Sequence, residues 1–208
     1  MKNLNIISIL LFGILFSHGC GEKTKEIKDV VSETQEIVKK TSKEAIEAPK
    51  TLNHLEALTK MTPVSDDAIK AWMPEELLGM PREFFNSGLM SQFGISSAAA
   101  TFKQKANTYI NIKFVDGAGE KGVTAIGPFF MTKSMEVNRE SASGYEKTVE
   151  QDGIKASERY TKSNEKYRIT FLYKERLGIT IESENLDREI VWKAIDAFDF
   201  DALLASSK

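Results

Sequence analysis

The sequence predicts an α+β fold, in which an antiparallel sheet of about six to seven strands carries short N-terminal helices and a C-terminal amphipathic helix packed on it. Three observations predict this fold. Apolar and polar residues alternate repeatedly beyond residue 82, turn-forming residues separate these segments, and the chain ends with apolar residues at helical spacing. The 208 residues, 41% of them hydrophobic, are enough for one good hydrophobic core.

The short N-terminal helices are expected within residues 51–81. Ser65, followed by Asp66 and Asp67, is typical of a helix start, because serine caps free backbone N–H groups and acids favour the first turn. The apolar residues that follow at helical spacing are Ala68, Ile69, Trp72 and Met73. Pro74 begins a further turn with the sequence PEELLG.

Three segments show the strongest strand pattern. In residues 107–116 the apolar side chains fall on alternate positions, and residues 166–175 and 177–184 repeat this pattern. Such alternation is typical of antiparallel strands with one buried face. Further strands are predicted near 92–103, 134–140, 144–150 and 154–162. Asp152-Gly153 predicts a tight hairpin turn, and Ser163-Asn164 a second turn.

The last predicted element is a helix over residues 186–198. Asn185 or Asp187 can cap it. One face carries four apolar residues, which are Val191, Ala194, Ile195 and Phe198. Consecutive hairpins followed by such a helix favour a sheet covered on one face.

Residues 1–19 indicate a signal peptide. Lys2 precedes an apolar run over residues 6–16, which is too short to span a hydrocarbon core of ~30 Å. The run ends at Gly19 and at Cys20, the chain's one cysteine. This arrangement resembles the lipobox of bacterial lipoproteins, although Ser17 stands where leucine is usual. The resemblance implies cleavage between Gly19 and Cys20, diacylglycerol on the Cys20 thiol, and an acyl chain such as palmitate on the new amine. The alternative is an ordinary signal peptide that leaves Cys20 as a free thiol.

Residues 20–50 are expected to form a charged, partly helical tether between the lipidated cysteine and a single α+β domain at 51–208. Lysine and glutamate dominate the segment, which lacks aromatic residues. Apolar residues and threonine recur every three or four positions, so a short dimerising helix is the alternative and the oligomeric state stays open. Gly21 follows the cysteine in place of the aspartate that retains enteric lipoproteins in the inner membrane. By this resemblance, the outer membrane is favoured over the inner membrane, and the leaflet stays open.

The domain also carries a resemblance, over residues 75–198, to an uncharacterised family of exported and lipid-anchored bacterial α+β domains. The matching segments are LLGMPR at 77–82, GYEKTVEQDGIKASERY at 144–160 and YRITFLYKERLGITIE at 167–182. A more distant likeness is to the sheets of PsbP/Mog1-type proteins. The first resemblance implies a fold and a place in the cell envelope but no activity, and the second concerns the fold alone.

The glycine-rich segment after the 107–116 strand matches G-x-G-x-x-G at Gly117, Gly119 and Gly122. Such a motif cradles phosphates when it lies in a βαβ unit. The neighbouring segments are predicted hairpins, and Pro128 interrupts any helix that follows. We therefore expect a mobile glycine loop and no bound cofactor.

Side chains suited to catalysis or metal binding are scarce. His54 is the only histidine after the signal peptide, so a typical zinc site lacks ligands. Ser163 and Lys166 match S-x-x-K within a predicted turn, without the partner motifs of that chemistry. Ser96 and Ser97 have no identifiable base. We expect no catalytic residues and no metal site, and the acids at Asp66-Asp67, Glu75-Glu76 and 182–187 are expected at helix starts and solvated turns.

The sequence thus predicts a non-catalytic accessory or binding module of the envelope, attached to a membrane through lipid on Cys20. An envelope protein is the expected partner. Nucleic acid is not expected, because the formal net charge is -2. One alternative is a carrier of lipid or another hydrophobic ligand, and another is an enzyme acting on envelope polymers. The carrier requires an apolar groove, for which the candidates are Phe84, Phe85, Phe129, Phe130, Met73, Met80, Met90, Met131 and Met135.

Overall fold

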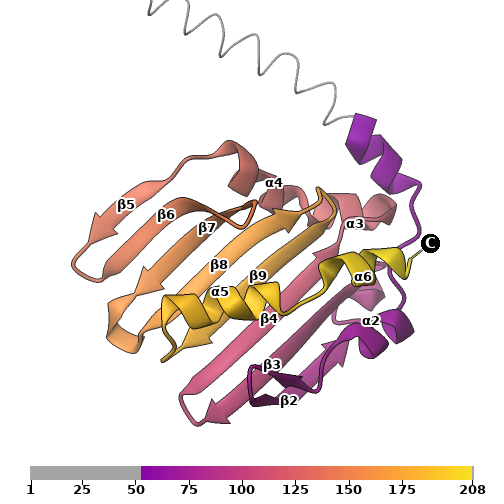
Figure 1. Cartoon of the computed structure of the whole chain (residues 1–208). Helices are drawn as coiled ribbons and strands as arrows, with labels where there is room; N and C mark the ends of the chain where they lie inside the picture. Colours follow the sequence, from indigo (N-terminus) through magenta and orange to yellow (C-terminus); the bar gives the residue numbers. More distant parts are fainter. Residues whose placement is uncertain (1–52, 208) are drawn as a thin grey trace, which may run out of the picture. The chain divides into compact units, whose positions relative to one another are not determined.

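The computed structural model describes residues 53–207, which form a nine-stranded antiparallel sheet with helices packed against it (Figure 1). From one edge to the other, the strands are β1 (Glu76–Leu77), β2 (Met80–Ser87), β3 (Ser97–Lys105), β4 (Thr108–Asp116), β9 (Leu177–Glu184), β8 (Lys166–Tyr173), β7 (Ile154–Thr161), β6 (Gly144–Gln151) and β5 (Asn138–Ser141). The helices are a stretch at 53–59, α2 (Asp66–Trp72), α3 (Gly119–Ala125), α4 (Gly127–Ser134), α5 (Arg188–Asp196) and α6 (Phe200–Ala205).

Two runs of consecutive hairpins meet in the middle of the sheet. The first run is β1 to β4 and the second is β5 to β9, and they join where β4 pairs with β9. This seam aligns Tyr109 with Glu184 and Phe114 with Ile179. After β4 the chain passes through α3 and α4 before it starts the second run at the far edge.

One face of the sheet carries the main core. Helices α5 and α6 cross this face over β8, β9 and β4 (Figure 1), and α2 packs at the same side. Trp192 of α5 is 1% exposed and lies in the same apolar cluster as Ile112 of β4 and Ile179 of β9. The alternation that the sequence shows in these strands therefore gives each strand one buried face.

A smaller apolar cluster covers one end of the opposite face. It joins Leu58 of the 53–59 helix, Ile126 and Leu172, with Phe129 of α4 packed against it. A Cβ atom built on Gly178 of β9 would lie 2.4 Å from the Phe129 ring, so only glycine lets this ring lie flat on the strand. The rest of this face has no helix over it among the described residues.

The prediction of an α+β fold with an antiparallel sheet is confirmed, but the count of six to seven strands is too low. The strands missed are β1 and β2, which fall partly where short helices and turns were expected. Leu78 and Gly79 both have positive φ and form a two-residue turn between β1 and β2. A β-bulge between Arg82 and Phe84 then breaks the alternation of β2, and this hides the strand from periodicity.

The expected mobile glycine loop is also wrong, because α3 begins at Gly119. Pro128, which we took as a helix breaker, lies in the first turn of α4, where proline is favoured. The glycines are required by close packing: a Cβ atom on Gly117 would lie 2.3 Å from Ile126 Cδ1, and one on Gly122 would lie 2.5 Å from the Asp116 carbonyl oxygen.

Other local predictions are confirmed. Ser65 caps α2 and accepts a hydrogen bond from the Ala68 N–H, with Asp66 and Asp67 in the first turn. Asp152 and Gly153 both have positive φ and join β6 to β7 as a tight turn.

The predicted C-terminal helix is shorter than expected, because α5 ends at Asp196 and the chain then forms α6.

Candidate functional site

The residues that carry the lipoprotein prediction, Gly19 and Cys20, lie outside the described residues, as does the tether at 20–50. Within residues 53–207 no helix is both long and apolar enough to span a membrane. The same residues hold no group of three or more histidine, cysteine or acidic side chains placed to bind a metal ion.

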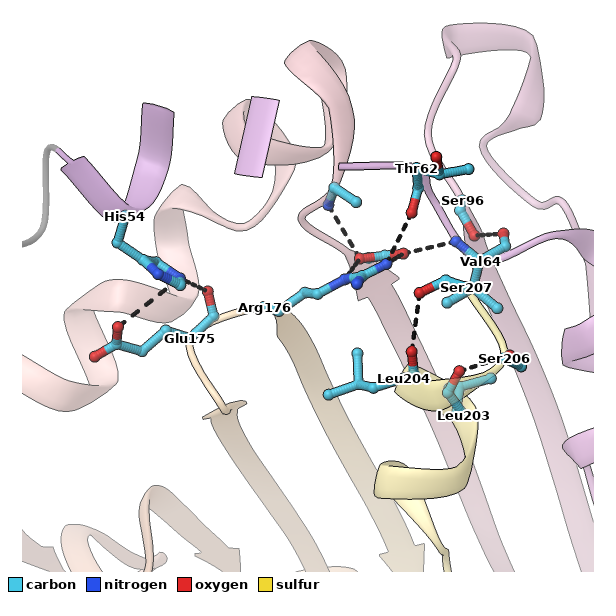
Figure 2. A network of polar contacts seen from close by, with 12 residues as sticks. His54, Thr62, Val64, Ser96, Glu175, Arg176, Leu203, Leu204, Ser206 and Ser207 are labelled. Atoms are coloured by element: carbon cyan, nitrogen blue, oxygen red, sulfur yellow. Dashed lines mark hydrogen bonds and ion pairs between the residues drawn. The ribbon is translucent and has the colours of Figure 1, made fainter. Parts of the chain in front are cut away.

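A buried ion pair stands where β4 ends (Figure 2). Asp116 is fully buried, and Arg176 donates to both of its carboxylate oxygens, with Nε 2.7 Å from Oδ1 and Nη2 2.8 Å from Oδ2. The backbone N–H of Val64 donates to Oδ2 at 2.8 Å and that of Ala118 to Oδ1 at 3.0 Å. We call these four residues the Asp116 clamp.

The Asp116 clamp fastens the segment that follows the 53–59 helix to the end of the sheet. Arg176 also donates to the Thr62 carbonyl, and the Ser96 hydroxyl donates to the Val64 carbonyl at 2.6 Å. Figure 2 shows His54 nearby, with its Nε2 atom 3.0 Å from the Glu175 carbonyl oxygen. Ser96 and His54 thus both contact backbone groups, and the clamp serves attachment of the N-terminal segment.

A second buried carboxylate, that of Glu158 on β7, lies under α5. Arg188 donates to both of its oxygens at 2.9 Å, Trp192 Nε1 donates at 2.9 Å, and the Tyr145 hydroxyl donates at 2.7 Å. Burial raises the pKa of Glu158, but the hydrogen bonds from Arg188, Trp192 and Tyr145 lower it by more, so this pKa lies below its ordinary value.

The Glu158 network is a structural crosslink between β6, β7 and α5. Burial first, and then the hydrogen bond to Glu158, raise the pKa of Tyr145 well above its ordinary value, so this hydroxyl keeps its proton. Tyr160 stacks between Tyr145 and Tyr167, with ring centroids 5.6 Å and 4.6 Å apart. Four donor contacts surround the one carboxylate, so it is held as an anion.

The uncovered face of the sheet is polar and charged. Rows of side chains cross it where the strands are in register, and we call this surface the open face. The central row, from β6 to β2, consists of Glu146, Arg159, Arg168, Glu182, Asn111, Thr101 and Phe84. The row beside it carries hydroxyl groups, which are those of Thr148, Ser157, Thr170 and Thr180.

Two arginines on the open face stand directly opposite one another. Arg159 of β7 pairs in register with Arg168 of β8, and both side chains are about half exposed, at 55% and 51%. Each makes one ion pair on its outer side: Arg159 Nη2 lies 2.8 Å from Glu146, and Arg168 Nη2 lies 2.9 Å from Glu182. Two hollows, of about 180 and 210 Å³, are both lined by this arginine pair.

The other predicted candidates do not gather into one site. Met73 and Met80 are buried in the main core, whereas Phe84, Met131 and Met135 are 50%, 55% and 44% exposed. Ser163 lies in a short 3₁₀ helix of the β7–β8 turn, as expected for a turn. Lys166 lies on the open face, 4.0 Å from Glu182.

No protein-family model, no curated protein and no solved structure matches this chain. The resemblances noted in the sequence therefore stay predictions. The candidate site rests on the geometry of the open face and its arginine pair, which the sequence analysis did not identify. The sequence did contain a signal for the arginine pair. The predicted turn at Ser163-Asn164 allows Thr161 to pair with Lys166, and this register places Arg159 opposite Arg168.

Proposed function

We propose that this chain is a lipid-anchored, non-catalytic binding module of a bacterial envelope, and that it binds its partner through the open face. One observation carries the binding role: the sheet buries its main core on one face, and the part of the other face outside the small Leu58 cluster is a polar, hollowed surface. An antiparallel sheet can face water on one side, but a plain solvated face does not need opposed arginines and adjoining hollows.

The anchor is supported by the sequence of residues 1–20 alone, and the outer membrane is the membrane we propose. The carrier alternative has no specific observation in its favour, because the described residues between the sheet and α5 are packed side chains such as Trp192 and Ile195. The enzyme alternative likewise gains no support from the carboxylates of Asp116 and Glu158, which are enclosed in separate networks.

Replacing Cys20 with alanine is expected to abolish lipid attachment. One acyl chain binds a membrane only marginally, at about 0.8 kcal/mol per buried CH₂, whereas two or three chains bind stably. Cells labelled with palmitate should incorporate the label into the wild-type protein and not into Cys20→Ala. Ser17→Ala serves as the control, because it changes the same segment and keeps the thiol. A wild-type protein without label would refute the anchor.

A photo-crosslinking residue at Thr180, on the open face, is expected to capture an envelope partner. The same residue at Lys193, which is exposed on α5, is the matched control on the opposite face of the sheet. Arg168→Glu should remove the Thr180 product, because it reverses the charge at the centre of the proposed contact. Equal products from both positions, insensitive to Arg168→Glu, would contradict binding through the open face.

A further inference from the structure

We propose that the arginine pair of the open face binds a phosphate group, so that the partner or ligand of this module carries phosphate. This inference rests on the proposed function and names the chemistry that the open face recognises. Its observations are the register of the two arginines, an excess of positive charge around them, and hydroxyl groups in the hollows beside them.

The register places two like charges side by side. In antiparallel sheets, residues directly opposite have Cβ atoms about 4.5–5.5 Å apart, and like charges at that distance repel. Arg159 and Arg168 occupy such positions. An anion between the two guanidinium groups would replace this repulsion with two attractions.

The local charge is also not balanced by protein carboxylates. Glu146 accepts from Arg159, while Glu182 is shared among Arg168, Lys166 at 4.0 Å and Lys113 at 3.7 Å. Glu184 stands opposite Lys166 in register, so four cations face three carboxylates in a chain whose overall formal charge is -2. This local reversal of sign attracts an anion.

The donors around the pair suit a tetrahedral oxyanion. A guanidinium has five N–H donors, and the ion pairs with Glu146 and Glu182 run through Nη2 in both arginines. The hollow of about 210 Å³ adds the hydroxyls of Ser157 and Thr170, whereas Thr132 on α4, which also lines it, donates its hydroxyl proton to the Phe129 carbonyl. Arginine binds phosphate through parallel N–H contacts, and a phosphate oxygen also accepts from hydroxyls.

The test measures thermal unfolding of the full chain as inorganic phosphate is added at constant pH and ionic strength, with acetate as the comparison anion. A ligand that binds only the folded state raises Tm with its concentration. We expect a saturable rise with phosphate for the wild type and for Lys193→Gln, and at most a small rise with acetate. The double variant Arg159→Gln/Arg168→Gln should bind phosphate at least tenfold more weakly.

A second variant, Arg159→Lys/Arg168→Lys, keeps both positive charges and should retain part of the rise in Tm with phosphate. This variant still tests the proposal if the glutamine variant does not fold. Flotation of Cys20→Ala with vesicles of an anionic phospholipid then separates a lipid headgroup from a soluble phosphorylated ligand as the source. An equal response to acetate, or an unchanged response in the glutamine variant, would overturn the proposal. Failure of phosphate binding with Thr180 crosslinking intact would leave the proposed function in place.

Discussion

Asp116→Ala is expected to lower the free energy of unfolding by about 3–5 kcal/mol, because removing one partner of a buried ion pair leaves the other charge uncompensated. The Arg176 side chain is only 12% exposed and could not recover full hydration. The same change leaves the N–H groups of Val64 and Ala118 without the carboxylate that accepts from them. Urea unfolding at neutral pH, followed by tryptophan fluorescence, measures the loss.

Asp201→Ala is the matched control for the Asp116 clamp. Asp201 also contacts a cation, Lys174, but both side chains are more than half exposed, so the solvent replaces the contact. The free energy of unfolding of Asp201→Ala should stay close to that of the wild type. Comparable stability of Asp116→Ala and Asp201→Ala would show that the clamp contributes little. The clamp variant should also expose residues 60–65 to proteolysis before the sheet unfolds.

Glu158→Gln is expected to destabilise the protein by about 2–3 kcal/mol at pH 7, because hydrogen bonds to a charged acceptor are replaced by weaker ones. The glutamine side chain has nearly the same size as glutamate but cannot accept from Arg188 with both of its terminal atoms. Arg188 is 34% exposed and regains some hydration, which keeps this loss below that expected for Asp116. Chemical unfolding at pH 7 measures the difference.

The loss at Glu158 should depend on pH in a defined direction. The pKa of Glu158 is lowered on folding, so its stabilisation is complete above the unfolded value of about 4.5 and disappears as the pH falls through the lower folded value. The difference between wild type and Glu158→Gln should therefore shrink between pH 7 and pH 3. A difference that stays constant over this range would show that ionised Glu158 does not stabilise the fold.

The sequence predicted the elements whose evidence is local. Ile110, Ile112 and Phe114 alternate along β4, and Ser65 and Asp152 mark a helix start and a turn, so these elements followed from spacing and turn chemistry. The bulge at Arg82 interrupts the alternation of β2, so the strand lacks the usual period of two. Pro128 in the first turn of α4 suggested a helix end, so α4 was not predicted.

The two buried carboxylate networks depend on contacts between distant residues, which no local pattern contains. Asp116 meets Arg176 across 60 positions, and Glu158 meets Arg188 across 30. The burial of Arg176 and Glu158 is decided by the order of the strands, so the neighbouring sequence does not identify either residue. The arginine pair was the exception, since the turn between β7 and β8 already sets its register.

The seam between β4 and β9 has a consequence for synthesis of the chain. β4 lies in the middle of the sheet, yet its neighbour and the helices that cover its apolar side chains come from residues 177–205. The ribosome makes these residues well after β4, so the hydrophobic interior around β4 cannot close until they have emerged. If the proposed signal peptide directs the chain to a translocation channel, the chain would reach it before this interior can close.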